Sequence, residues 1–161
     1  MQHQSVALKE VMFHTGVADV AGHVARLAAR VLRNQESMVV LCQPSEINAI
    51  DEALWGSGRT DFLAHSRPEA SAAVHVHSSI ALVTSLDQLP QLDPAQGPSS
   101  SACGPGVRFR LLSTLQEWVP GCEAFEKLIE VVTPQGTTQA RARWKQFAQM
   151  GVALSNTAIG P

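Results

Sequence analysis

Short apolar runs alternate with longer amphipathic segments along the first third of the chain. Residues 10–17 (EVMFHTGV) and 37–43 (SMVVLCQ) are short and largely apolar, as expected of strands buried in a parallel sheet. Between them, residues 19–34 place apolar side chains at helical spacing, with His23 and three arginines largely on the other face. Residues 45–55 (SEINAIDEALW) repeat the helical pattern after the second strand. This alternation predicts a parallel βαβ core.

The pattern becomes less regular towards the middle of the chain. Residues 62–66, 77–85 and 107–114 predict further short strands. Between the last two, residues 86–106 hold four prolines and a Ser/Gly cluster. This composition predicts a flexible loop within the domain rather than a boundary between domains.

Two helices are predicted in the last quarter of the chain. Residues 122–132 (CEAFEKLIEVV) form the first, with four apolar side chains buried: Phe125, Leu128, Ile129 and Val132. Residues 139–150 form the second, with Thr137 or Thr138 as its N-cap and Gly151 directly after its end.

Length and composition fit one domain. The chain has 161 residues, of which 45% are hydrophobic and 16% charged, and its formal net charge is −2. A chain of this length can bury a substantial core, and a slightly acidic balance disfavours wholesale binding of nucleic acid. We therefore expect residues 1–161 to form a single α/β domain, with a mostly parallel (mixed) sheet flanked by helices.

The sequence lacks the common motifs of catalysis and nucleotide binding. It has no G-x-G-x-x-G after the first strand, no phosphate-binding P-loop, no G-x-S-x-G and no H-E-x-x-H. The fold is therefore expected to be Rossmann-like without a nucleotide-binding motif. We predict no catalytic residue and no cofactor.

Histidine offers one alternative, a metal site. His75 and His77 would face the same side of a strand, and His65 could approach them. No acidic or cysteine partner lies at a characteristic ligand spacing. We therefore predict that these histidines are bystanders and that no metal ion is bound.

The three cysteines and the distribution of apolar residues bear on the compartment. The cysteines are widely spaced and odd in number, so they predict neither a disulfide framework nor a C-x2-C metal site. Cys42, at the end of an apolar run, is expected to be a small buried side chain. Because no apolar run approaches the length of a membrane span, we expect a cytoplasmic protein without membrane association.

The end of the chain is basic and aromatic. Residues 131–161 contain three cations and no Asp or Glu, which gives this segment a charge of +3. Arg141, Trp144 and Lys145 lie at helical positions i, i+3 and i+4, so they share one face. A guanidinium beside an indole suits a ligand that has both a carboxylate and an apolar side chain. The alternative is a solvated basic face without a ligand.

A second cluster pairs two aromatic residues in a chain with few of them. Trp55 ends one predicted helix and Phe62 follows in the next segment, whereas only 5% of the chain is aromatic. Such residues either cap the core or anchor a protein partner.

Two regions are similar to the chi subunit of bacterial DNA polymerase III. Residues 39–65 (VVLCQPSEINAIDEALWGSGRTDFLAH) resemble that family's strand, its helix ending in D-E-x-L-W, and its following F-[hydrophobic]-x-H. Residues 140–158 (ARARWKQFAQMGVALSNTA) resemble its final R-x-R-[aromatic]-K helix and the tail after it.

The resemblance implies a role in DNA replication without intrinsic catalysis. Members of this family are accessory subunits of the clamp loader that bind the psi subunit on one surface. On another surface they bind the acidic, Phe-terminated C-terminal tail of single-stranded DNA-binding protein (SSB). Such a protein would meet single-stranded DNA only through SSB and would be a monomer or a heterodimer with psi.

The same resemblance assigns residues to the two surfaces. By position, Trp55 and Phe62 match the psi-facing aromatic residues. Val132, Arg141 and Trp144 match the SSB-tail pocket, and Lys145 keeps positive charge nearby. Two rival functions remain at this stage, an α/β enzyme and a domain that binds nucleic acid directly through its basic helix.

Overall fold

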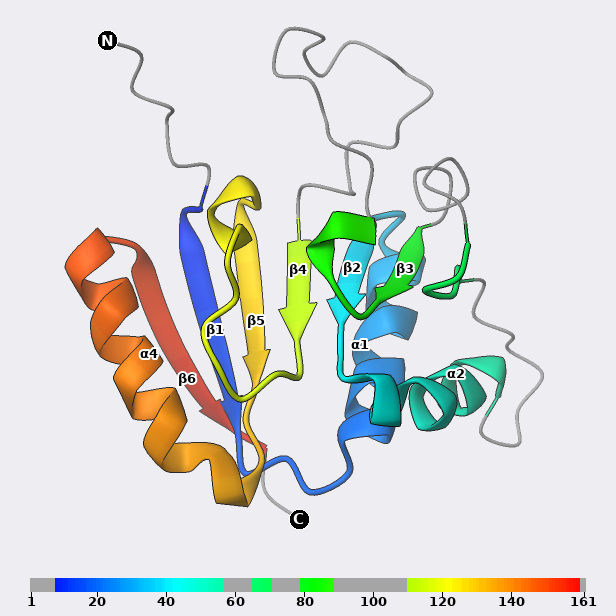
Figure 1. The fold of residues 1–161 in the computed structure, drawn as a ribbon, viewed down its shortest axis with the longest axis horizontal. Helices are drawn as coiled ribbons and strands as arrows, with labels where there is room; N and C mark the ends of the chain where they lie inside the picture. Colours follow the sequence, from blue (N-terminus) through cyan, green and yellow to red (C-terminus); the bar gives the residue numbers. More distant parts are fainter. Residues whose placement is uncertain (1–7, 57–64, 71–78, 89–109, 160–161) are drawn as a thin grey trace, which may run out of the picture.

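The computed structural model describes residues 8–56, 65–70, 79–88 and 110–159. They form one six-stranded sheet in the order β3-β2-β4-β5-β1-β6, in which every pairing is parallel (Figure 1). The strands are β1 (Glu10–Thr15), β2 (Met38–Leu41), β3 (Ile80–Val83), β4 (Arg110–Ser113), β5 (Lys127–Val131) and β6 (Ala153–Ala158). The longer helices are α1 (Val20–Arg33), α2 (Ile47–Trp55) and α4 (Thr137–Met150). Short 3-10 turns lie at Pro44–Glu46, Leu86–Gln88, Cys122–Ala124 and Pro134–Gly136. The predicted α/β fold with a mostly parallel sheet is confirmed.

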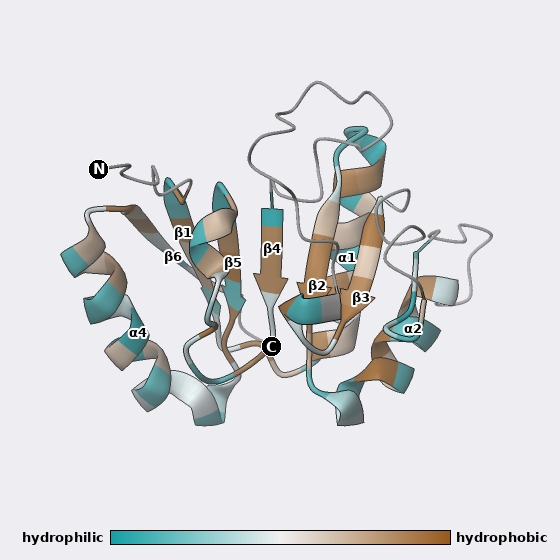
Figure 2. Ribbon diagram, turned by 45° about the horizontal axis from the view of Figure 1, so that its top comes forward, coloured by the Kyte–Doolittle hydropathy of each residue, from teal (hydrophilic) through white to brown (hydrophobic). Residues whose placement is uncertain are grey.

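Helices cover both faces of this sheet. β2 is buried along its whole length, and its successive side chains point to opposite faces. Val39 and Leu41 join the core that includes α4, whereas Met38 and Val40 join the core beneath α1 and α2. Hydrophobic residues dominate the central strands, as Figure 2 shows. α4 and the α1–α2 pair therefore lie on opposite faces of the sheet.

The first helix begins where the sequence supplies a cap. Asp19 Oδ1 accepts a hydrogen bond from Gly22 N at 3.0 Å, which satisfies one of the free amides of the first turn. His23 was expected on the polar face with the arginines, and this expectation is wrong. The residue is only 6% exposed, because its ring lies against His14 of β1 with 2.9 Å between their nitrogens.

The prediction of a helix over residues 122–132 is also wrong. Only a short turn forms at Cys122–Ala124, and Lys127–Val131 form β5 between β1 and β4. The apolar positions fit a strand as well, because Leu128 faces the α4 side of the sheet and Ile129 the other. Pairing on both sides satisfies the backbone of β5, and its β-branched side chains favour a strand. The predicted burial of four side chains is confirmed: Phe125, Leu128, Ile129 and Val132.

The last helix begins earlier than predicted and is not capped by a threonine. α4 starts at Thr137, and no side chain caps it; the Thr137 hydroxyl instead donates to the Pro134 carbonyl at 3.2 Å. The predicted end is confirmed, because Gly151 follows the helix with a φ of 77°, a left-handed conformation that glycine adopts without strain.

A sixth strand follows that the sequence pattern did not predict. Of the strands that the structure describes, only β1 pairs with β6, in a register that matches Ala153 with Glu10 and Ala158 with Thr15. Its side chains are mostly exposed. This strand places the end of the basic segment beside β1 and opposite α4.

Candidate functional site

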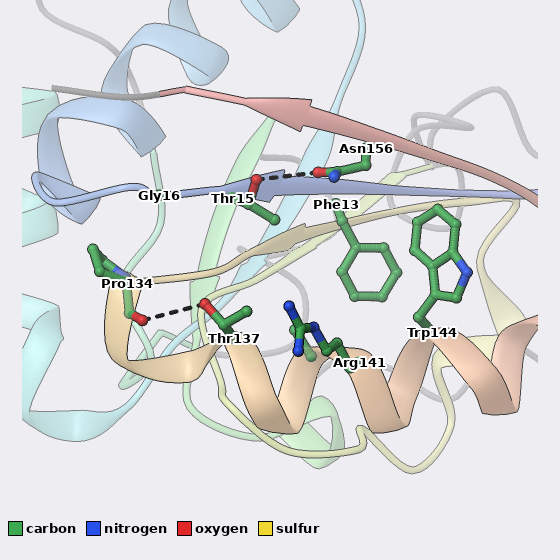
Figure 3. A pocket seen from close by; sticks show the side chains of 9 residues that line it. Phe13, Thr15, Gly16, Pro134, Thr137, Arg141, Trp144 and Asn156 are labelled. Carbon is green, nitrogen blue, oxygen red and sulfur yellow. Dashed lines mark hydrogen bonds between the residues drawn. The ribbon is translucent and has the colours of Figure 1, made fainter.

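A cavity of about 620 Å3 lies between α4 and the strands β1 and β6 (Figure 3). Its walls come from the end of β1, the turn before α4, the first half of α4, and the middle of β6. The lining residues are Phe13, Thr15, Gly16, Pro134, Thr137, Ala140, Arg141, Trp144 and Asn156.

Two aromatic rings form the apolar wall of this cavity. Phe13 reaches from β1, and its ring centroid lies 5.2 Å from that of Trp144 and 6.2 Å from that of Phe147. Trp118 packs on Phe147 in turn, with 4.8 Å between centroids. Each such pair stabilises by about 0.5–1.5 kcal/mol beyond the burial of its area. Trp144 is therefore fixed against the core while half-buried beside the cavity.

Arg141 supplies the positive charge of the site. It is exposed on α4, between Thr137 and Trp144 on the same helical face, and Figure 3 shows its guanidinium directed towards the space below β1. Among the residues described, Arg141 has no carboxylate partner. Its donors are therefore available to an anionic ligand.

A hydrogen bond between the two strands completes the polar part. Thr15 Oγ1 donates to Asn156 Oδ1 at 3.1 Å, which joins the end of β1 to β6 (Figure 3). This contact uses the amide oxygen of Asn156, so its NH2 group remains as a donor on the β6 side of the cavity, across from Arg141. The cavity thus combines a fixed apolar wall with a guanidinium and an amide donor. Such a set suits a ligand that ends in a carboxylate and an apolar side chain.

The structure brings together only some of the residues predicted for this site. Arg141 and Trp144 both line the cavity. Lys145 is exposed on the same helix but lies outside the lining. Val132 is fully buried in the core beneath α4, where its backbone bonds to His14 and Val17, and it does not line the cavity.

The sequence reasoning missed the residues that β1 and β6 contribute. Phe13 could have been found, because it alternates with Val11 on the face that α4 covers. No local signal marked Thr15 or Asn156, because their proximity depends on β6 pairing with β1.

The second predicted surface lies on the other side of the sheet. Trp55, at the end of α2, is 60% exposed. Its ring contacts the ring of His65 edge-on at 6.4 Å, and His65 Nε2 bonds to Asp51 Oδ1 at 2.5 Å. Asp51 also pairs with Arg67 at 2.5 Å. Phe62 lies outside the described residues.

Other candidate chemistry is limited. Cys42 and Cys122 are free and buried, as expected for Cys42, and burial raises the pKa of each thiol to about 12. Within residues 8–56, 65–70, 79–88 and 110–159, no group of three or more His, Cys, Asp or Glu could hold a metal ion. His75 and His77 lie outside those ranges. None of the described helices has the length and apolar character to span a membrane.

Comparison with known proteins identifies the family. The family model described as DNA polymerase III chi subunit, HolC, matches residues 8–155. No curated protein matches the chain. The matched span includes all three longer helices and most of the cavity lining.

Proposed function

The chain belongs to the DNA polymerase III chi subunit family, and from this premise we propose that it is a non-catalytic tether in DNA replication. It links the clamp loader to SSB by binding the acidic C-terminal tail of SSB in the cavity beneath β1 and β6. On the opposite side of the sheet it binds the psi subunit.

The cavity supports the proposal that the protein binds the SSB tail. Arg141, which has no carboxylate partner in the described part of the chain, lies with the rings of Phe13 and Trp144 in the wall of the cavity. Residues 131–161 contain no acidic side chain that would repel an acidic peptide. The terminal carboxylate of the tail accepts hydrogen bonds from the Arg141 guanidinium, and the last side chain packs on Trp144. Lys145, exposed on the same helix, attracts the acidic residues that precede it.

The exposed Trp55 supports the proposal that the protein binds the psi subunit. A large side chain that is 60% exposed in a free protein is typical of the anchors that dominate protein interfaces. The Asp51–His65 pair beneath it restricts its orientation. We assign Trp55, with Phe62, to the psi-binding surface.

The tail site is tested by titrating the protein with an acidic peptide ending in phenylalanine, while following tryptophan fluorescence. Arg141→Ala removes a charge-assisted contact of about 1.5–3 kcal/mol, so it should weaken binding about 10- to 150-fold. Amidating the peptide's C-terminus removes the other half of the same contact. Combining both changes should therefore cost clearly less than the sum of the two.

Arg33→Ala is the matched control, because Arg33 is an exposed arginine at the end of α1, away from the cavity. It should leave the affinity unchanged. Equal binding by wild type and Arg141→Ala would refute the assignment of the cavity.

A further inference from the structure

Among the described residues, the outward-facing backbone groups of β6 have no partner along the edge of the sheet. β6 is the terminal strand of the sheet and pairs only with β1. Ala153 N donates to Lys9 O at 3.0 Å, and Ile159 N donates to Thr15 O at 2.8 Å. Because alternate residues of a parallel strand bond to the same neighbour, the odd-numbered residues face β1. The N–H and C=O groups of Leu154, Asn156 and Ala158 therefore point away from the sheet.

At the opposite edge of the sheet, outward-facing backbone groups of β3 are paired with another segment of the chain. Beside β3, Ser66 N donates to Ile80 O and Leu82 N donates to Ser66 O, both at 2.9 Å. The backbone of Ser66 thus forms hydrogen bonds with outward-facing groups of β3, the other terminal strand. In the described part of the chain, nothing equivalent pairs with β6.

β6 also lacks the usual protection of an open edge. Soluble proteins commonly place lysine, proline or a bulge on an edge strand, so that other strands do not add to it. β6 has the sequence ALSNTA, without a charge or a proline, and its register with β1 runs unbroken over all six residues. An unprotected edge of this length is suited to accept a strand from a partner.

The open edge is continuous with the cavity. Asn156 contributes its side chain to the cavity lining and its backbone to the outer edge. A peptide whose last residue occupies the cavity must therefore leave it close to β6. No Asp or Glu occurs from Val131 onwards, so an acidic peptide meets no like charge from this segment.

We propose that the partner peptide adds to the sheet as a seventh strand. The residues before the C-terminal residue run extended along β6, and their backbone bonds to Leu154, Asn156 and Ala158. The main chain then contributes affinity that does not depend on the peptide's side chains. This proposal rests on the proposed function, because the cavity must hold the end of the same peptide.

Amide hydrogen exchange of the full chain, measured by NMR with and without the acidic peptide ending in phenylalanine, tests the pairing directly. In the free protein the amides of Ser155 and Thr157 are protected by β1, whereas those of Leu154, Asn156 and Ala158 exchange quickly. Adding the peptide should slow exchange at these three amides. Protection that is already present in the free protein and rises with protein concentration would indicate self-association through β6, and would overturn the proposal.

A second experiment measures the affinity of the same peptide for variants of Ala158. Ala158→Pro removes one outward N–H and leaves the bonds to β1 intact, since proline is tolerated where an edge N–H faces solvent. The loss of one backbone hydrogen bond should weaken binding about 3- to 10-fold. Ala158→Val keeps the N–H and should bind like wild type, and thermal unfolding checks that both variants fold.

The two hypotheses fail in different ways. If Arg141→Ala weakens binding but the three amides stay unprotected and Ala158→Pro binds normally, the added strand is refuted and the cavity assignment stands. If Arg141→Ala has no effect, the cavity assignment itself fails. N-methylation of the peptide at successive positions gives an independent check, because only every second amide of an added strand faces β6. Affinity losses without this alternation would also refute the added strand.

Discussion

Glu130 of β5 and Arg143 of α4 form an ion pair inside the protein, with 2.6 Å between Glu130 Oε2 and Arg143 Nε. The two residues are only 1% and 3% exposed. Residues two positions apart on a helix lie on nearly opposite sides. Because Arg143 points into the core, Arg141 is directed to the open side of α4, where it reaches the cavity. Together with the buried Ala140 and Phe147, this pair therefore holds the rotation of the helix that carries the site.

The pair is a constraint on geometry more than a source of stability. Glu130 Oε1 and both terminal nitrogens of Arg143 are buried without a hydrogen-bond partner among the described residues. Burial raises the pKa of Glu130 to about 7, against the opposing attraction of the Arg143 guanidinium. Burying two charges costs about as much as their attraction returns, whereas removing one partner leaves the other uncompensated.

Arg143→Met should therefore lower the free energy of unfolding by about 3–5 kcal/mol, because Glu130 is left unpaired. The double variant Glu130→Leu/Arg143→Met removes both charges and should recover most of that loss. Urea unfolding followed by circular dichroism measures both. A double variant as unstable as the single one would show that packing, and not the unpaired charge, dominates.

Much of the fold could be predicted from the sequence, because its periodicities reflect local burial. The strand–helix alternation from β1 to α2 follows from apolar side chains that recur at spacings of two or of 3.6 residues. The segment 122–132 satisfied both spacings, and only its pairing with β1 and β4 selects the strand. β6 carries no apolar alternation, since it is an exposed edge held mainly by backbone bonds to β1.

The candidate site was predictable to a smaller degree. Arg141 and Trp144 were identified because they lie on one face of one helix, which is a local relationship. Phe13, Thr15 and Asn156 come from strands at the two ends of the chain, which only the tertiary fold brings together. Val132 was assigned by position in a family pattern, and in the structure it is fully buried directly after β5.

The contribution of His14 and His23 to the stability of the protein should fall in mild acid. Burial lowers the pKa of both rings, and Arg30 adds to the effect at His14. At His23, whose pKa is lowered to about 4, the ring of His14 and then Arg26 add to the effect of burial, while Asp19 opposes them. An unfolded histidine titrates near 6.5, so between about pH 6.5 and pH 4 the unfolded state binds more protons. The contribution of the two histidines to the free energy of unfolding then decreases as the pH falls through this window, whereas Glu130, whose pKa is raised to about 7, contributes with the opposite sign.

His23→Gln isolates this contribution. Between pH 7 and pH 5 the wild type should lose about 1–2 kcal/mol more than the variant, whatever their difference at pH 7. Denaturant titrations at a series of pH values give the comparison. Parallel pH profiles for the two proteins would mean that the folded His23 titrates normally.

The two binding surfaces should act independently, because Trp55 and Arg141 lie on helices that cover opposite faces of the sheet. Trp55→Ala removes an exposed anchor and should weaken psi binding by about 2 kcal/mol or more, roughly 30-fold. The affinity for the SSB-tail peptide should stay within about a factor of two. Phe62→Ala is expected to behave in the same way. Loss of both interactions in a variant that still folds would contradict the separation of the surfaces.

Adding positive charge to the cavity should strengthen its affinity for the acidic SSB tail. Thr137 lies one helical turn before Arg141 and lines the cavity, and its hydroxyl bonds to the Pro134 carbonyl at the exposed start of α4. Thr137→Lys adds a cation where the carboxylate and the acidic residues of the tail arrive. An added exposed charge of this kind contributes about 0.5–1 kcal/mol at low salt, so binding should tighten about 2- to 5-fold.

The complementary change is Asn156→Asp, which replaces an amide by a carboxylate of similar shape across the cavity from Arg141. The new carboxylate should offset the positive charge of Arg141 and repel the terminal carboxylate of the tail, so affinity should fall by at least about 10-fold. Asn156→Ala is the matched control, because it removes the amide donor without adding charge and should cost less. Added salt should narrow the difference between Asn156→Asp and wild type, since screening weakens the repulsion. If Asn156→Asp bound the tail as tightly as Asn156→Ala at every salt concentration, the terminal carboxylate would not lie in this cavity.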